Sequence, residues 1–566
     1  MMTVLLRLAG LAVVVVVASL ALLAPPCSAA DSAETIINVW PQPVTQTCTG
    51  QSPRKLWQSF SITSTQDSLS PIIARYTRII ADIVTDKDAW APKKSANSIN
   101  GMVISVSQPA IPDREPSAES YTIATNDNTI AVHTPSIAGA VYALETFTQI
   151  LMEGQGAVPC DNLEVRDSPT LANRGLVVDV ASRYLDLQTM HELIDSMAML
   201  KLNTLGMHFS DYGAFRVATR YNELTDDLNG LYPGHVMSNL QEYASQRGVR
   251  LVPHMELPSH ASGFQPAEDN VFFCTSDDVY TEKSVLNNDA STLSFLGDVI
   301  TDVLTHFDTP YFFVGGADAA AAAGNCTVAD VKRVFLSAVS SVTKPGTKAA
   351  VWDMAAAALT KQLPKDTLVF ATPGSKPVAT AGSTIVSGYR NVNASMPSLP
   401  FAGEGASQDS YRDYTAMGPS VTGAAATFFT NAMCEEQPCG SNSTITPPAS
   451  FLAPRTQDRP ARNATLSSLF PRVTYMAGAA WNFRNITATD LRQRVYNFNA
   501  FMALRGAQVC PNSCECTLEH YCKDKYEHYD AEIKLFEAGF IFGTVLATTA
   551  AASVIFLQIR RFTSAR

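Results

Sequence analysis

Five polar residues of this chain each follow a short apolar run, and their side chains are of the types that transfer protons in enzymes. They are Asp179, His208, Asp211, His260 and Asp318. Imidazole and carboxyl groups serve as general acids and bases because their surroundings can shift their pKa values toward neutral pH. If the apolar runs are neighbouring parallel strands, their carboxyl ends bring these side chains to one end of a barrel. The pattern therefore predicts an active site built from strand ends.

The elements that would position these residues alternate from Leu171 onward. Apolar runs predict strands, and the amphipathic stretches between them have helical spacing. The predicted strands are 176–178, 203–208, 250–254, 311–314, 349–352 and 367–370, and the predicted helices are 186–201, 236–246 and 292–306. This order is typical of a parallel sheet, and its length suits a closed (β/α)8 TIM barrel with insertions over residues 169–506.

Residues 31–168 have a different pattern, which predicts a small α+β domain before the barrel. The runs 121–125 and 129–133 alternate like two strands joined by a turn at 126–128. Ser136 then precedes a helix whose apolar positions are Ile137, Val141, Leu144, Phe147 and Leu151. The expected fold class is therefore α/β, with a (β/α)8 barrel preceded by a small α+β domain.

Both ends of the chain are typical of targeting or membrane segments. Residues 1–30 carry Arg7, an apolar run and a small-residue cleavage site, which predicts a signal peptide rather than a retained anchor helix. Residues 538–557 carry no charge and are long enough to cross a bilayer of about 30 Å as a transmembrane helix. Arg560 and Arg561 follow, which places the tail 558–566 in the cytoplasm. A lipid-anchor signal is the rival, but its apolar tail would normally end the chain.

We therefore expect a single-pass type I membrane protein with a lumenal or extracellular body, at the cell surface or in an endo-lysosomal membrane. Residues 507–537 form a Cys-rich juxtamembrane stalk in this scheme. Removing Cys27 with the leader leaves ten of the eleven cysteines, an even number that suits an oxidising compartment. Five glycosylation sequons agree with that address, at Asn325, Asn393, Asn442, Asn463 and Asn485.

Charge and cysteine spacing argue against other classes of protein. A formal net charge of −11 over 566 residues disfavours a nucleic-acid partner. A zinc site at Cys510, Cys514, Cys516 and Cys522 is possible by count, but these cysteines lack the paired CxxC spacing of zinc modules. We expect no metal and no cofactor.

Several segments together resemble the family 20 glycoside hydrolases, the lysosomal-type β-N-acetylhexosaminidases. The matching segments, in family order, are 40–43, 136–149, 174–185, 208–211, 253–260, 315–318, 469–472 and Trp481. The resemblance implies an α+β domain followed by a (β/α)8 barrel. It also implies action on terminal β-linked N-acetylglucosamine or N-acetylgalactosamine of glycans, a disulfide between Cys274 and Cys326, and a possible homodimer.

The family reaction is substrate-assisted: the acetamido oxygen of the sugar attacks the anomeric carbon. In a Gly-Gly-Asp-Glu motif, the Asp orients the acetamide and stabilises its developing positive charge, and the Glu protonates the leaving oxygen. Here the matching residues are Ala317 and Asp318. The resemblance thus makes Asp318 the candidate acid, shorter by one methylene, and leaves the polarising carboxylate missing. A shifted register, with Asp318 as the polariser, leaves the acid missing instead.

Other site residues follow from the same resemblance. His260 and Asp211 match the His and Asp that stand behind the acid, although a structural histidine is the alternative for His260. Arg174 matches an arginine that grips sugar hydroxyls, with a solvated surface arginine as the alternative. Trp352 matches a wall of the acetamido pocket, or is barrel core. Asn431 replaces a pocket Glu, and further pocket positions have changed to Met207, His254, Thr372 and Phe429.

These changes lead to two hypotheses about function. A displaced acid costs about 10²-fold in rate, and a lost electrostatic group about 10²- to 10³-fold. The first hypothesis is a membrane-anchored hexosaminidase with weakened or lost activity. The alternative is a non-catalytic glycan-binding or surface interaction protein on the same scaffold.

Overall fold

A computed structural model describes the chain from residue 37 to residue 507. Its gaps are 51, 85–89, 93, 96, 109–115, 183, 212–213, 222–229, 268, 276–283, 317, 360, 372–383, 392–410, 412, 414–415, 417–420, 429–468 and 471. The predicted signal peptide, the transmembrane segment 538–557 and the tail lie outside these residues, as does the stalk beyond residue 507. In the part that is described, no helix is both long and apolar enough to span a bilayer.

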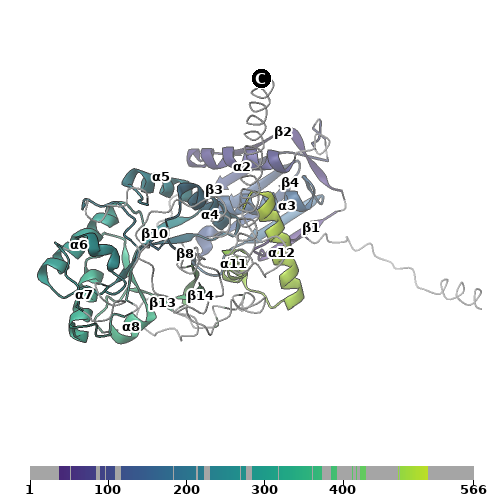
Figure 1. Cartoon of the computed structure of the whole chain (residues 1–566). Coiled ribbons are helices and arrows are strands. Elements are labelled where there is room, and N and C mark those ends of the chain that lie inside the picture. The colour runs from purple at the N-terminus through teal and green to yellow at the C-terminus, as the bar shows by residue number, and fades with distance from the viewer. Residues whose placement is uncertain are drawn as a thin grey trace, which may run out of the picture.

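Eight parallel strands close into a barrel (Figure 1). They are β8 (Asn173–Asp179), β9 (Thr204–Ser210), β10 (Arg250–Leu257), β11 (Tyr311–Gly315), β12 (Lys348–Trp352), β13 (Leu368–Ala371), β14 (Thr384–Asn391) and β15 (Val421–Phe428). Each strand pairs in parallel with the next, and β15 pairs with β8 to close the ring. The helices outside are α4 (Leu187–Met199), α5 (Gly234–Ser245), α6 (Ala290–Thr305), α7 (Val328–Ser340), α8 (Asp353–Leu359), α11 (Arg472–Asn482) and α12 (Ala488–Leu504). The barrel is therefore confirmed.

Because side chains alternate between the two faces of each strand, the barrel has one apolar core outside and another inside. Outward side chains such as Leu176 and Val178 pack with the surrounding helices in one large apolar cluster. Inward side chains form a second cluster inside the barrel, rich in aromatic rings: Val252, Tyr311, Phe313, Ala350, Trp352, Leu368, Phe370 and Ala425. Because the interior is filled in this way, polar side chains at the carboxyl ends of the strands face the cleft above it.

The preceding domain is a seven-stranded mixed sheet in the order β1-β7-β4-β5-β3-β2-β6. Its elements are β1 (Thr45–Thr49), β2 (Arg54–Ser64), α2 (Ser70–Ile83), β3 (Ser98–Val106), β4 (Tyr121–Asn126), β5 (Thr129–Thr134), α3 (Ile137–Glu153), β6 (Ala157–Val158) and β7 (Asn162–Asp167). The predicted hairpin is confirmed by antiparallel β4 and β5, and the predicted helix is α3, whose N-cap Ser136 accepts a hydrogen bond from the Gly139 N–H. A disulfide joins Cys48 to Cys160, and the expected Cys274–Cys326 bridge is also present.

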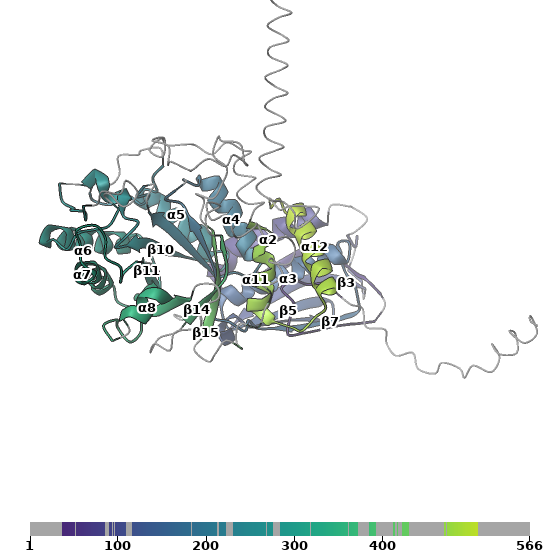
Figure 2. The same ribbon diagram turned by 60° about the horizontal axis from the view of Figure 1, so that its bottom comes forward.

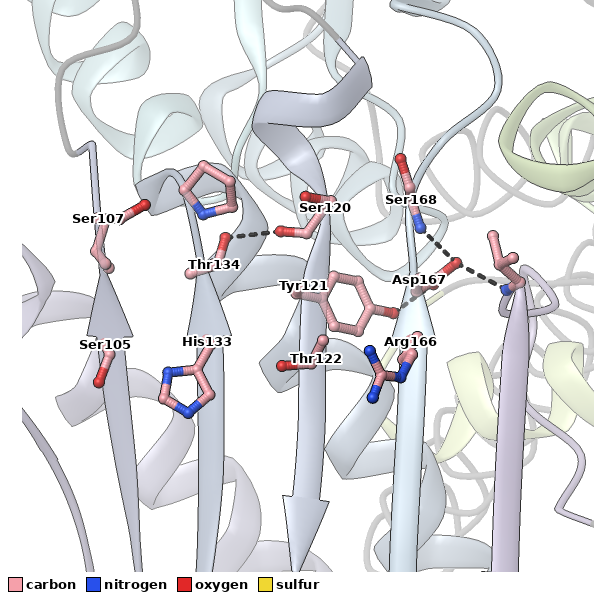
Figure 3. Close-up of a pocket in the computed structure, with 13 residues that line it drawn as sticks. Ser105, Ser107, Ser120, Tyr121, Thr122, His133, Thr134, Arg166, Asp167 and Ser168 are labelled. Carbon is pink, nitrogen blue, oxygen red and sulfur yellow. Dashed lines mark hydrogen bonds between the residues drawn. The ribbon is translucent and has the colours of Figure 1, made fainter.

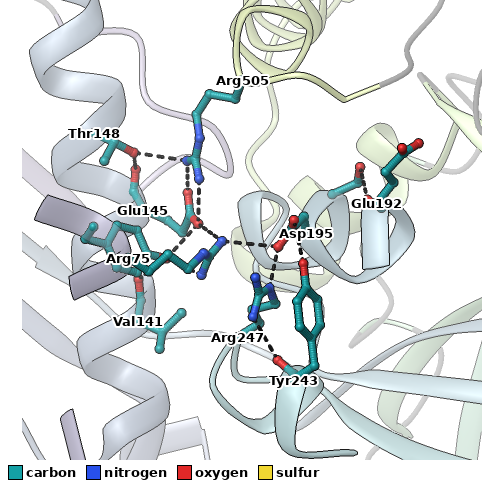
Figure 4. Close-up of polar contacts among 11 residues, drawn as sticks. Arg75, Val141, Glu145, Thr148, Glu192, Asp195, Tyr243, Arg247 and Arg505 are labelled. Atoms are coloured by element: carbon teal, nitrogen blue, oxygen red, sulfur yellow. Dashed lines mark hydrogen bonds and ion pairs between the residues drawn. The ribbon is translucent and has the colours of Figure 1, made fainter. Parts of the chain in front are cut away.

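A buried ionic cluster joins this domain to the barrel and to the helix α12, which lies alongside α2 and α3 in Figure 2. Glu145 of α3 is fully buried and pairs with Arg75 of α2 and with Arg505 just after α12 (Figure 4). Arg75 also lies 3.5 Å from Asp195 of α4, which pairs with Arg247 beyond α5. Breaking a buried pair by removing one partner is strongly destabilising, so this cluster fixes how the two domains pack.

Candidate active site

Three predicted site residues lie together at the carboxyl end of the barrel. Asp211 directly follows β9, His260 lies just beyond β10, and Asp318 lies just beyond β11. One Asp211 oxygen lies 3.1 Å from His260 Nδ1, and His260 Nε2 lies 3.8 Å from an Asp318 oxygen. The same Asp318 oxygen accepts a hydrogen bond from the Ser259 hydroxyl at 3.1 Å. The three residues form a line, Asp211–His260–Asp318, in which one imidazole joins two carboxylates.

Exposure changes along this line. Asp211 is buried, the His260 side chain is 32% exposed and the Asp318 side chain is 56% exposed. The backbone of His260 has a left-handed φ of 59°, a conformation that is uncommon for a residue with a side chain. The line therefore runs from the protein interior to solvent, with Asp318 at the end that a substrate can reach.

The pKa values along the line follow from its hydrogen bonds. Burial alone would raise the pKa of Asp211, but hydrogen bonds with His208 and His260 bring it well below its usual range. Burial alone would lower the pKa of His260, but the hydrogen bond and charge of Asp211 raise it. A charged imidazole beside Asp318 is thus favoured.

His208 forms a second branch on Asp211. Its Nε2 lies 2.7 Å from the other Asp211 oxygen, and it is fully buried. Burial would lower the pKa of His208, but the hydrogen bond with Asp211 raises it to about 9. Asp179 at the end of β8 lies within electrostatic reach of His208, and burial raises the pKa of Asp179. The sequence pattern therefore located five residues correctly at this end of the barrel.

In the structure Arg174, the residue expected to grip sugar hydroxyls, is not brought together with these five. It begins β8, so it lies at the amino end of the barrel, opposite the cleft. Its guanidinium is fully buried, pairs with Glu119 of the preceding domain at 2.5 Å and donates to the Lys201 and Leu171 carbonyls. It also lies over the Trp481 ring. Arg174 therefore holds the two domains together and does not reach the cleft.

Trp352 lies inside the barrel, 3% exposed, against Phe313 and Phe370. This position fits the alternative of barrel core, although its indole N–H reaches upward to Glu256 at 2.9 Å. Ala317 and Asn431 lie outside the described residues.

Two further residues lie at this end of the barrel: Glu256, which was not named from the sequence, and His254, which was named only as a changed pocket position. Both point inward from β10, after Val252, and both are buried. Burial, together with the charge of His208, lowers the pKa of His254 to about 4, so this imidazole is neutral at physiological pH. The available signal was the alternation of the strand, which was predicted to end at residue 254 and continues to residue 257.

A second hollow, of about 530 Å³, lies far from this line in the chain's fold, on the sheet of the preceding domain (Figure 3). Its labelled residues are mostly hydroxyl-bearing, with His133 on β5 and Arg166 on β7, the two strands on either side of β4. Among the residues that the structure describes, no group of three or more His, Cys, Asp or Glu side chains is arranged to hold a metal ion.

Comparison with known families matches both parts of the chain to one family. Residues 172–401 match the catalytic domain of glycosyl hydrolase family 20, and residues 37–168 match domain 2 of the same family. Together these matches cover more than half of the chain.

Individual proteins are more distant. Beta-hexosaminidase subunit A2 of Dictyostelium discoideum is 29% identical over 300 residues, which are 50% of this chain and 54% of that protein. The chain spans only about a third to about half of the length of the curated relatives that it matches best.

Solved structures share the fold. A mutant Streptomyces plicatus beta-hexosaminidase with an Asp-to-Ala change, in complex with GlcNAc, has a TM-score of 0.61 at 18% identity, over 85% of this chain and 98% of that one. A Vibrio harveyi exo-β-N-acetylglucosaminidase, described as an inactive Asp-to-Ala mutant, has a TM-score of 0.61 at 17% identity, over 86% and 81%.

Proposed function

The chain belongs to glycosyl hydrolase family 20, and from this premise we propose that its cleft binds the terminal β-linked N-acetylhexosamine of a glycan and cleaves it slowly. The observation that carries this proposal is the line Asp211–His260–Asp318, which ends in an exposed carboxyl group at the mouth of the barrel. Family membership supplies the reaction class, and the line supplies a group that can transfer a proton.

In this proposal the acetamido oxygen of the substrate forms a bond to the anomeric carbon as the glycosidic bond breaks. Asp318, in its protonated form, gives its proton to the leaving oxygen. Water then attacks the anomeric carbon, the bond between that carbon and the acetamido oxygen breaks, and the water gives a proton back to Asp318. His260 holds Asp318 in place from one side and Ser259 from the other, while Asp211 fixes the orientation of the His260 ring.

Two features support a low rate. Asp318 is shorter by one methylene than the Glu of the family motif, so its carboxyl group is displaced from the leaving oxygen. Ala317 brings no carboxylate to orient the acetamide. Displacing an acid and losing one electrostatic group cost together about 10⁴- to 10⁵-fold.

A non-catalytic glycan-binding protein is the second candidate, and it has specific support. The Vibrio harveyi relative with an Asp-to-Ala change is described as inactive, and the Streptomyces plicatus relative with such a change was solved with GlcNAc bound. An Asp-to-Ala change is therefore compatible with lost activity in one protein of this fold and with binding of GlcNAc, the reaction product, in another.

We also propose that the protein is a glycosylated type I membrane protein, anchored by residues 538–557 after removal of residues 1–30, and that it forms a homodimer. The sequence of the two ends and the disulfides support the topology, and the homodimer is what the family resemblance implies. Protease protection of a tag after residue 566 in sealed vesicles tests the orientation, and light scattering in detergent tests the dimer.

Hydrolysis of aryl N-acetyl-β-glucosaminide and galactosaminide by the full-length protein in detergent tests the main proposal. We expect slow release of the aryl group, reduced at least about 10²-fold by Asp318→Asn, because the acid is removed. Turnover that survives this substitution would remove Asp318 from its role. If neither protein hydrolyses the substrates but both bind N-acetylglucosamine, the second candidate holds.

A further inference from the structure

Glu256 is a buried carboxylate at the carboxyl end of the barrel, and the reaction above gives it no part. It is the last inward residue of β10, above Val252 and His254, and only 4% of it is exposed. A carboxylate in such a position is expensive to bury unless its charge is stabilised by hydrogen bonds. The hydrogen bonds that Glu256 accepts therefore bear on its role.

Each oxygen of Glu256 accepts a hydrogen bond from a fixed N–H group. The backbone N–H of Gly316 donates to Oε1 at 2.8 Å, and the indole N–H of Trp352 donates to Oε2 at 2.9 Å. Donors to both oxygens stabilise the ionised form and leave the group little freedom to rotate. Glu256 is thus a preorganised negative charge.

The glycine pair of the family motif makes this arrangement possible. Gly315 has a left-handed φ of 84°, and a Cβ on it would lie 2.5 Å from Glu256 Oε1. Gly316, which has a φ of 97°, turns its N–H toward the same oxygen. The chain therefore brings the Glu256 carboxylate to the backbone of the residue that directly precedes Ala317.

The charge of Glu256 also acts on the line Asp211–His260–Asp318. Burial lowers the pKa of His260. The hydrogen bond with Asp211 and then the charges of Asp211, Glu256 and Asp318 raise it. The titratable groups at this end of the barrel on the neighbouring elements include Asp179, His208, Asp211, His254, His260 and Asp318. Glu256 thus belongs electrostatically to the same end of the barrel as the acid.

We propose that Glu256 supplies the negative charge that stabilises the positively charged, cyclised acetamido intermediate, in place of the carboxylate that Ala317 lacks. This inference rests on the proposed function. Glu256 exchanges no atom or proton: the acetamido oxygen bonds to the anomeric carbon, the glycosidic oxygen leaves with the proton of Asp318, and the positive charge stays on the acetamido group. Glu256 replaces the charge of the missing group but not its contact with the acetamide, so turnover stays slow.

Binding of a charged and a neutral sugar to the full-length protein in detergent tests this inference. The neutral probe is N-acetylglucosamine, and the charged probe is its analogue in which a protonated amidine replaces the acetamide, so that the positive charge lies on the acetamido position. We expect the wild-type protein to prefer the cation, and Glu256→Gln to lose about 100-fold of that preference while binding of N-acetylglucosamine changes little. An unchanged preference in a Glu256→Gln protein that still binds N-acetylglucosamine overturns the inference and leaves the proposed function intact.

A second variant keeps the test decisive if Glu256→Gln does not fold. Ala317→Asp leaves Glu256 and its donors untouched and restores the motif carboxylate. If Glu256 already supplies the charge, Ala317→Asp raises the preference for the cation by less than about threefold, whereas a site without such a charge gains about 100-fold, which overturns the inference. If the wild-type protein binds neither sugar, the proposed function itself fails.

Discussion

The two ends of the barrel use the same kinds of charged residues in opposite ways. At the amino end, Arg174 pairs with Glu119, and Lys201 pairs with Asp167 at 2.9 Å, all of them buried beneath the preceding domain. At the carboxyl end, the line from Asp211 through His260 to Asp318 emerges into solvent. A buried ion pair holds two domains together, whereas a line of titratable groups that reaches solvent can exchange protons with a ligand.

The largest expected effect lies at the amino end. Arg174→Leu removes the guanidinium and leaves Glu119 as a buried, uncompensated charge, so we expect the free energy of unfolding to fall by about 3–5 kcal/mol. Chemical denaturation measures this loss. The double variant Glu119→Gln with Arg174→Leu is the matched control and should recover part of it. If Arg174→Leu instead keeps its stability and loses N-acetylglucosamine binding, the division between the two ends is wrong.

A smaller effect on the free energy of unfolding is expected from His208, which is buried at the carboxyl end of the barrel. Its folded pKa of about 9 lies above the unfolded value of about 6.5, so its stabilising contribution is complete below pH 6.5 and is lost as the pH rises through 9. The difference corresponds to up to about 3 kcal/mol. Denaturation curves at pH 6 and pH 9.5 should show this fall in the wild-type protein and a flatter dependence in His208→Gln. Equal slopes in the two proteins would show that His208 is not charged in the fold.

The smallest expected effect concerns the exposed tip of the line. Ser259→Ala removes one hydrogen bond to Asp318, worth about 1 kcal/mol, and should lower kcat about fivefold with KM unchanged. Ser259→Thr keeps the hydroxyl and is the matched control. A change in KM alone would indicate that Ser259 contacts the substrate instead.

How much of this could be predicted from the sequence differs between the two ends. Asp211, His260 and Asp318 were placed together because each follows a strand, and the carboxyl ends of parallel strands converge. Arg174 was placed with them although it begins its strand, and the five-residue step from Arg174 to Asp179 spans about 16 Å. Position within a strand therefore decides which end of the barrel a side chain occupies.

Glu256 illustrates a second limit. The sequence pattern predicts a strand over 250–254, whereas β10 continues through Leu257. The turn of Gly315 and Gly316 toward Glu256 depends on left-handed backbone angles in another strand, which single-sequence patterns do not report. The position of Glu256 thus depends on tertiary hydrogen bonds, which the spacing of residues in the sequence does not predict.

A double-mutant cycle on kcat tests most directly whether the carboxyl end works as one catalytic line. It compares wild type, His260→Gln, Asp318→Asn and the double variant, with an aryl N-acetyl-β-glucosaminide as substrate. Residues that act as a unit give strongly non-additive effects, so we expect the double variant to be about as slow as Asp318→Asn alone. Additive losses, or a His260→Gln protein as fast as wild type, would contradict the account.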